Sequence, residues 1–369
     1  MSDNFNNKGY EDYFKQLEKG LENPTEKPYE RIVVSKKRVN TRKTKRIKKL
    51  KKRAIALFLA VVLVTASVFV IKGILNDDSK KEPIDKVEEK VEKEEVIKKQ
   101  KISFKFSEDV LEIPDSNDAK NVIIIDKTSK RVIAQRNAEE RAYPASTTKI
   151  MTLLVAAENI TDWEKEFTMT LEITDPLFRE WATVAGFLNG EVITMRDLAY
   201  GMILPSGADG AVGIAISVAG SEQAFVELMN KKVEELELKN THFTNVSGLH
   251  NEQNYSTAYD MAVILEAALQ NDFCKQVLST YQYRTTVTNQ HPEGILLSST
   301  LFSYMYGTEP ETSTILGGKT GYVNESGYCI ASFGKSNAND NEYIIVTLGN
   351  SSLWPAFFGQ IDLYKQFAK

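Results

Sequence analysis

The chain has 369 residues, which allows one large domain or two ordinary ones. Hydrophobic residues make up 42% of it and charged residues 26%, so a folded core is feasible over most of its length. Its two cysteines and three histidines lack the spacing of metal-binding motifs, and the sequence implies no metal or other cofactor.

Basic residues are concentrated near the N-terminus. Residues 1–53 hold 17 Lys+Arg against 7 Asp+Glu, whereas residues 76–369 hold 28 against 43. Twelve of the basic residues lie within 36–53, a segment without an acid. Such a tract binds nucleic acid in some proteins, but beside a membrane it more simply keeps the tail in the cytoplasm and contacts anionic lipid. We therefore interpret residues 1–53 as a cytoplasmic, mostly disordered tail and expect no nucleic-acid partner.

An uncharged apolar segment follows this tract. It covers 18 residues, 54–71, and with the next four it is long enough to cross a bilayer as a helix. A cleaved signal peptide is the alternative, but the apolar region and the preceding tail are both too long for one. The sequence thus predicts a single-pass membrane anchor over 54–75. Residues 76–107, dense in Glu and Lys, are expected to form a charged stalk that holds the next domain outside the membrane.

Residues 108–369 carry the patterns of a folded domain. Residues 121–126 and 131–135 are β-branched runs on either side of a polar turn, which predicts a hairpin whose first strand is buried on both faces. Helices are expected in five segments: from Ser146 to about residue 159, over 195–204 with Thr194 as the cap, and over 211–219, 222–236 and 257–270.

Strand patterns return in the last third of the chain. Residues 282–288, 327–333 and 343–348 are rich in β-branched or aromatic residues, and residues 353–367 form an amphipathic helical pattern. Strands at both ends with helices between them predict an α+β fold, in which one antiparallel sheet built from both ends is flanked by helices around a helical middle region. Nothing places Cys274 near Cys329, so we interpret both as buried free thiols rather than a disulfide.

Ser146 and Lys149 stand at the start of the first predicted helix. Their spacing places both side chains on one face of the helix, and the first turn favours developing negative charge. The lysine amine acts as a base only when it is neutral, which requires burial or a second cation to lower its pKa. On its own, this pair is more simply explained by an N-cap serine followed by a surface lysine.

Two later stretches change that interpretation. Ser206-Gly-Ala208 lies on the break between two predicted helices, and Lys319-Thr-Gly321 stands at a predicted strand. Their order and spacing after Ser146 match the penicillin-recognising serine acyltransferases. More closely, the chain resembles the D-alanyl-D-alanine carboxypeptidases among the low-molecular-mass penicillin-binding proteins, of the β-lactamase/transpeptidase-like superfamily. The resemblance covers about residues 110–350 in five ordered motifs: Pro144-Ala-Ser-Thr-Thr-Lys-Ile-Met-Thr152, Leu204-Pro-Ser-Gly-Ala-Asp209, Thr244-Asn-Val-Ser-Gly-Leu249, Ser256-Thr-Ala-Tyr-Asp-Met-Ala262 and Gly318-Lys-Thr-Gly-Tyr322.

The resemblance implies three catalytic residues. Ser146 is expected to attack the carbonyl between two D-alanines and to form an acyl-enzyme, with Lys149 as its base. Ser206 is expected to pass the proton toward the leaving amine, because a hydroxyl both donates and accepts.

Four further residues are expected to bind the substrate. Lys319 is the cation that keeps Lys149 neutral and, with Thr320, attracts the terminal carboxylate of the substrate. Gly321 lets the strand edge approach the substrate closely. The backbone N–H groups of Tyr322 and of the nucleophile form the oxyanion hole in this family.

Three positions depart from the family pattern. Ala208 replaces an asparagine whose amide usually binds the substrate and steadies the lysine, Asn254 stands where a histidine is common, and residues 349–353 lack an arginine. Because the nucleophile, base and cation are intact, we expect an active variant with weaker binding or altered preference.

Several polar residues in these motifs have structural explanations. We interpret Asp209 as a helix N-cap, and Asn245 and Gly248 as residues that shape a turn. His250 and His291 are not expected to be catalysts, because a Ser-Lys arrangement needs no histidine.

The leading hypothesis is a membrane-anchored serine-type D-Ala-D-Ala carboxypeptidase that trims peptidoglycan stem pentapeptides outside the membrane and is inhibited by β-lactams. An endopeptidase cleaving D-Ala cross-links, or a β-lactamase, is the alternative among enzymes, although the sequence does not reveal a deacylating carboxylate. A catalytically weak wall-binding or regulatory protein is the alternative from another class, motivated by Ala208 and the basic tail.

Overall fold

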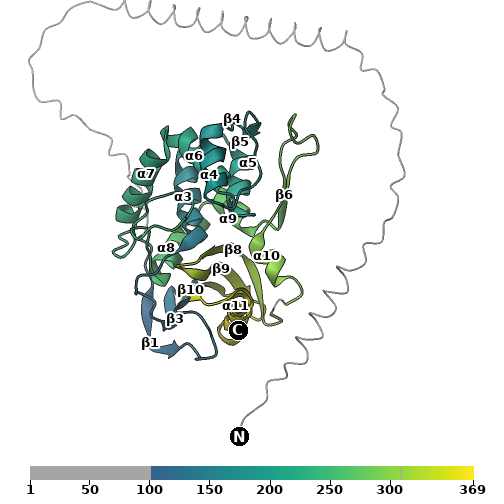
Figure 1. Ribbon diagram of the computed structural model, residues 1–369. Coiled ribbons are helices and arrows are strands. Elements are labelled where there is room, and N and C mark those ends of the chain that lie inside the picture. The colour runs from purple at the N-terminus through teal and green to yellow at the C-terminus, as the bar shows by residue number, and fades with distance from the viewer. Residues whose placement is uncertain (1–100, 309) are drawn as a thin grey trace, which may run out of the picture. The chain divides into compact units, whose positions relative to one another are not determined.

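The structure is a computed structural model that describes residues 101–308 and 310–369, arranged as Figure 1 shows. The predicted tail, the predicted transmembrane anchor and the predicted stalk up to residue 100 lie outside the described residues.

A six-stranded sheet is the centre of the fold. Its order is β1-β3-β2-β10-β9-β8, and every neighbouring pair is antiparallel except β1 and β3, which are parallel. The strands are β1 (Lys105–Glu112), β2 (Asn121–Asp126), β3 (Arg131–Arg136), β8 (Ser313–Val323), β9 (Gly327–Ser336) and β10 (Glu342–Asn350). Because β2 pairs with β10, strands from both ends of the domain share one sheet. The predicted hairpin and the predicted antiparallel sheet are confirmed.

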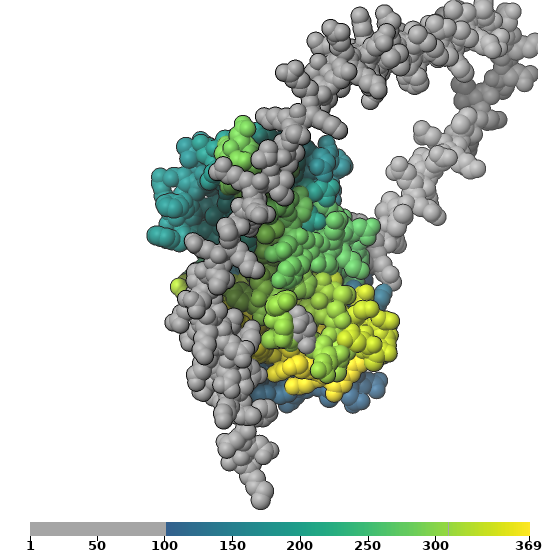
Figure 2. All heavy atoms as spheres, turned by 90° about the vertical axis from the view of Figure 1, so that its right-hand side faces the viewer, coloured from purple at the N-terminus to yellow at the C-terminus, as the bar shows by residue number. Residues whose placement is uncertain are grey.

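Helices cover both faces of this sheet. They are α3 (Lys149–Asn159), α4 (Leu171–Arg179), α5 (Met195–Ile203), α6 (Ala208–Ala219), α7 (Glu222–Glu235), α8 (Ala258–Leu269), α9 (Asp272–Ser279), α10 (Thr300–Met305) and α11 (Leu353–Phe367). Two small two-stranded sheets pair β4 (Glu166–Thr168) with β5 (Val192–Thr194) and β6 (Gln282–Arg284) with β7 (Leu296–Ser298). Figures 1 and 2 both show the earliest strands and the C-terminal helix at one end of this unit.

Alternate residues of β2 enter two different hydrophobic cores. Ile123 and Ile125 pack in the core that contains α3 and α8, whereas Val122 and Ile124 pack in the core beneath α11. A strand covered on both faces needs apolar residues at every position, which explains the uninterrupted run in the sequence.

The N-caps of α5 and α6 determine where the two helices around Ser206 begin. Thr194 caps α5 in a capping box with Asp197, as predicted. Helix α6 begins at Ala208 rather than at residue 211, because its N-cap is Gly207, directly after the break at Ser206.

Within the described residues no single helix is long and apolar enough to cross a membrane, although α6 and α7, bent by 86° where they meet, together pass that test of length and composition.

Two strand boundaries differ from the prediction. Strand β1 was not predicted, and the boundary at residue 108 falls inside it; the strand is charged and pairs only at the sheet edge, so it lacks the usual alternation. The strand predicted over 282–288 ends at Arg284. Thr285 N–H still donates to the Ile295 carbonyl, but Thr286 N–H donates to the Asp197 carboxylate instead of to the opposite strand.

Both cysteines are buried free thiols, as predicted. The Cys274 thiol lies against the Leu153 carbonyl, and the Cys329 thiol lies against the Tyr143 carbonyl.

Candidate active site

The turn that carries Ser146 is a short 3-10 helix, Ala145–Thr148, that leads directly into α3. Ala145 has a positive φ of 47°, and this bend presents Ser146 at the start of the helix. The Lys149 Nζ atom lies 3.0 Å from Ser146 Oγ and donates to the Ser247 carbonyl at 2.6 Å. The predicted pair is therefore in hydrogen-bond contact.

The loop that supplies the Ser247 carbonyl is shaped by its own residues. The Asn245 Oδ1 atom accepts hydrogen bonds from the Ser247 and Gly248 N–H groups at 3.2 and 2.7 Å. Gly248 has a φ of +83°, and a Cβ there would lie 1.9 Å from the Ala145 carbonyl oxygen. Only glycine fits so close to the nucleophile turn. The predicted turn-shaping roles of Asn245 and Gly248 are confirmed.

A second serine–lysine pair comes from distant parts of the chain. The Lys319 Nζ atom donates to Ser206 Oγ at 2.9 Å and to the Thr320 carbonyl at 2.7 Å. Ser206 has a φ of +70°, uncommon for a residue with a side chain, at the break before α6. The Thr320 hydroxyl lies 2.7 Å from that of Thr300.

Burial controls the charge of both lysines. Lys149 is 2% exposed, and burial lowers its pKa to about 7, opposed by the negative charge of Asp209. Burial lowers the pKa of Lys319 well below its ordinary value, and the nearby charge of Lys149 lowers it further. Two buried amines near one another disfavour a second proton. A neutral amine beside Ser146 is thus accessible near neutral pH.

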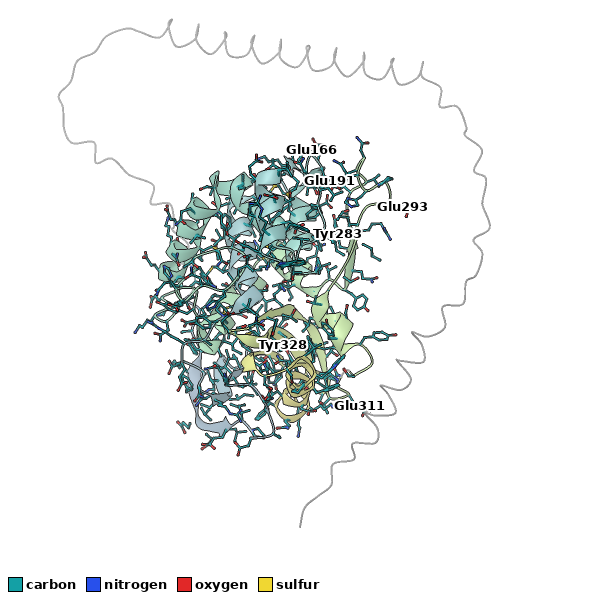
Figure 3. All side chains as sticks on the ribbon, viewed as in Figure 1. Glu166, Glu191, Tyr283, Glu293, Glu311 and Tyr328 are labelled. Atoms are coloured by element: carbon teal, nitrogen blue, oxygen red, sulfur yellow. The ribbon has the colours of Figure 1, made fainter. Side chains whose placement is uncertain are left out.

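Strand β8 forms the edge of the sheet beside the nucleophile. A Cβ on Gly321 would lie 2.7 Å from the Ser146 backbone nitrogen, so the strand passes in direct contact with that turn. The Tyr322 side chain is 49% exposed, and its ring packs 4.3 Å from that of Tyr328, which Figure 3 labels on the sheet. An edge strand leaves backbone groups free for an extended peptide.

Ser146, Lys149, Ser206 and Tyr322 line one cavity of about 400 Å³. Lys319, Thr320 and Gly321 do not line it: Lys319 is 1% exposed and reaches it through Ser206. The structure thus brings the three predicted motifs together.

Other parts of this cavity were not predicted from the sequence. The Ser247 carbonyl was not predicted, because a backbone acceptor places no demand on residue type. Residues 180–183, which we call the wall segment, also line the cavity and match no motif. Glu325 lines it too, as does His250, whose ring packs edge-on against Tyr143 with centroids 4.8 Å apart.

The interpretation of Asp209 as an N-cap is wrong. Gly207 is the N-cap of α6, and the Asp209 carboxylate lies inside the first turn, where it accepts hydrogen bonds from backbone N–H groups of residues 185–187. Ala208 is buried in the cavity lining, and its N–H donates to the Thr183 carbonyl at 2.7 Å. Asn254 is buried beside the nucleophile turn, with its amide 3.5 Å from the Thr148 hydroxyl.

The chain is similar to known proteins over most of the described residues. The family model described as D-alanyl-D-alanine carboxypeptidase, Peptidase S11, matches residues 108–352. The D-alanyl-D-alanine carboxypeptidase DacF of Bacillus subtilis is 30% identical over 220 residues, 60% of this chain and 55% of that protein. The D-alanyl-D-alanine carboxypeptidase DacA of Escherichia coli is 38% identical over 162 residues, 42% of this chain and 40% of that protein. The chain therefore spans about half the length of these curated relatives.

Solved structures show the same fold. The DD-transpeptidase of Streptomyces K15 superposes with a TM-score of 0.60 at 26% identity, over 68% of this chain and 97% of that one. Penicillin binding protein 5 of Haemophilus influenzae superposes with a TM-score of 0.61 at 25% identity, over 69% and 72% of the two chains. The sheet, the three motifs and these matches agree that the chain belongs to the D-alanyl-D-alanine carboxypeptidase family.

Proposed function

We propose that this protein is a serine-type D-Ala-D-Ala carboxypeptidase that removes the terminal D-alanine of peptidoglycan stem pentapeptides. The observation that carries the proposal is the buried contact between the Lys149 amine and the Ser146 hydroxyl, 3.0 Å apart, in a cavity of about 400 Å³. The family of the chain supplies the substrate class.

In the proposed reaction, neutral Lys149 takes the Ser146 proton while Oγ attacks the carbonyl between the two D-alanines. The negative oxygen that forms is stabilised by the backbone N–H groups of Ser146 and Tyr322, and such a donor lowers the barrier by about 3 kcal/mol. The C–N bond then breaks, and the released D-alanine amine receives its proton through Ser206. Water hydrolyses the acyl ester and regenerates the serine.

Lys319 and its neighbour Thr320 are suited to bind the substrate's terminal carboxylate. Lys319 and Thr320 are proposed to attract it. A negative carboxylate close to a buried amine favours the protonated, cationic form of that amine, and the two charges then attract each other. The bond between Lys319 and Ser206, 2.9 Å long, supports this role by linking carboxylate binding to the proton relay.

We also propose that residues 54–75 anchor the protein in the cell membrane as one helix. Residues 1–53 would then be the cytoplasmic tail and residues 76–107 would lead outward to a catalytic domain outside the cell, where peptidoglycan is found. The support is the uncharged run of 18 residues directly after the basic tract.

The test is covalent trapping by a penicillin, whose strained amide resembles the D-Ala-D-Ala bond. The detergent-solubilised full chain is incubated with fluorescent penicillin and measured by intact mass. One adduct per chain is expected, and it should be absent in Ser146→Ala with an unchanged circular dichroism spectrum. A slowly decaying adduct, with release of D-alanine from a pentapeptide, supports the carboxypeptidase, whereas rapid decay favours a β-lactamase. A folded wild type without an adduct would instead support the wall-binding or regulatory alternative.

A further inference from the structure

We propose that Asp209 is a positioning residue that fastens the wall segment of the cavity and sets the electrostatic environment of the catalytic lysine. The proposal rests on the proposed function for its kinetic consequences, and on the geometry alone for its structural ones.

Three of the four hydrogen bonds that the Asp209 carboxylate accepts come from one loop. The side chain is 1% exposed, and Oδ1 accepts from Ala185 N at 2.8 Å, while Oδ2 accepts from Gly186 N at 3.0 Å and from Phe187 N at 3.2 Å. Its remaining bond, 2.9 Å from Gly210 N to Oδ1, is within its own helix. Three consecutive backbone donors gathered by one carboxylate fix the course of a loop that has no regular structure of its own.

The neighbours of Asp209 bind the same loop. The Ala208 N–H donates to the Thr183 carbonyl at 2.7 Å. At Gly207 a Cβ would lie 2.5 Å from Asp209 Oδ1 and 2.6 Å from Ala185 N, so the backbone there touches the loop directly. Residues 207–209 thus form one clamp on residues 183–187. Gly207 and Ala208 contribute only backbone contacts to this clamp, so the Asp209 carboxylate is its side-chain part.

The loop that is clamped in this way continues into the wall segment. Residues 180–183 line the cavity that also contains Ser146 and Lys149. The opposite end of the loop is held separately, since the Glu191 carboxylate, labelled in Figure 3, accepts from Leu188 N at 2.8 Å. Loss of the Asp209 contacts would therefore leave the loop held at Thr183 and Leu188 only, and it would loosen the wall segment near the nucleophile.

Asp209 also acts on Lys149 through its charge. Among the described residues, the titratable side chains of Glu180, His250 and Glu325 line the cavity that contains Lys149. The charge of Lys149 acts on Lys319 of β8, and the Asp209 carboxylate on α6 raises the pKa of Lys149 against the effect of burial. Asp209 thus limits how far burial lowers the pKa of Lys149. A helix-start residue with a purely structural role would not shift the titration of the base.

The experiment compares Asp209→Asn with Asp260→Asn in the full-length protein. Asp260 is a matched control: it is a buried carboxylate in the first turn of α8, bound to Asn240 N at 3.2 Å and to the Thr241 hydroxyl at 2.8 Å, and it does not line the cavity of Ser146. The readouts are the second-order rate constant for acylation by benzylpenicillin as a function of pH, and hydrogen exchange of peptides that cover residues 180–188.

For Asp209→Asn we expect the acid limb of the pH profile to move to lower pH, because no negative charge remains to stabilise the Lys149 ammonium. The plateau rate should fall on the order of 100-fold, because a displaced wall misplaces the reacting groups. Exchange at residues 185–187 should accelerate, whereas Asp260→Asn should change none of these readouts. An acid limb at the wild-type position in Asp209→Asn, or an equal change in the control, would overturn the proposal.

Asp209→Glu provides the test if the asparagine variant does not fold. It keeps the charge and displaces the carboxylate, so a wild-type acid limb with a reduced plateau and faster loop exchange is expected; an unchanged plateau and unchanged exchange would overturn the proposal. If the wild type shows no acylation at all, the proposed function fails, and the exchange measurements alone then decide whether Asp209 fastens the loop.

Discussion

The Lys149 amine lies 3.0 Å from the Ser146 hydroxyl, inside the protein rather than at its surface. A lysine at this spacing on an exposed helix would be charged at neutral pH and unable to accept a proton. Burial reverses this, and its pKa of about 7 makes the neutral amine, the form that the proposed base needs, dominant over the upper part of the physiological range.

This relationship predicts the pH dependence of acylation. Lys149 must be neutral to act, so the rate should rise as pH increases through about 7 and then level off. The measurement is the rate constant for acylation by benzylpenicillin between about pH 5 and 9, with a parallel thermal melt to show that the fold is intact. A rate that is flat across this range, in a folded protein, would exclude Lys149 as the base.

The contact between β8 and the nucleophile turn predicts a sharp effect of one methyl group. In Gly321→Ala, the new Cβ would lie 2.7 Å from the Ser146 backbone nitrogen, and relief of that clash moves the turn away from the strand. We expect acylation to fall on the order of 100-fold. The matched control is Gly220→Ala at the end of α6, where the φ of +81° disfavours a side chain but no atom lies within 4 Å of the added methyl. The control should lose some stability and keep its acylation rate; equal loss of activity in both variants would contradict the prediction.

The missing amide at position 208 predicts a gain of function. Ala208 lines the cavity, so Ala208→Asn places an amide among Ser146, Lys149 and Ser206. One additional hydrogen bond to a bound substrate contributes about 1 kcal/mol, which corresponds to several-fold faster acylation. Ala208→Leu adds volume without an amide and should be slower than wild type. A decrease in Ala208→Asn as large as in Ala208→Leu would show that this wall has no room for the family's asparagine.

The two cysteines are predicted to be chemically silent in the folded protein. Burial raises the pKa of Cys274 to about 12 and that of Cys329 to about 11, and the reactive thiolate is scarce in both. Ellman's reagent at about pH 8 should therefore find no rapidly reacting thiol in the native protein and two thiols after denaturation. A single rapid thiol in the native state, or none after denaturation, would contradict the free, buried assignment.

Local patterns were reliable wherever neighbouring residues decide the structure. The hairpin from Asn121, the cap at Thr194 and the closing helix α11 follow from alternation, side-chain capping and helical periodicity, which act over a few residues. Strand β1 escaped prediction because its charged sequence is stabilised only by pairing with β3 at the sheet edge. The role of Asp209 was wrongly predicted for a similar reason, since its partners at residues 185–187 are about twenty positions earlier in the chain.

By itself, the sequence determined the identity and order of the three motifs, the α+β class and the family to which the chain is similar. Only the tertiary structure decided that Lys149 is buried beside Ser146, that Lys319 reaches Ser206 across 113 positions, and that the Asp209 carboxylate binds the backbone of residues 185–187. The physical reason is that desolvation and long-range hydrogen bonding depend on what surrounds a residue in space. A pattern of residue types along the chain specifies which groups are available, whereas packing specifies their pKa values and their partners.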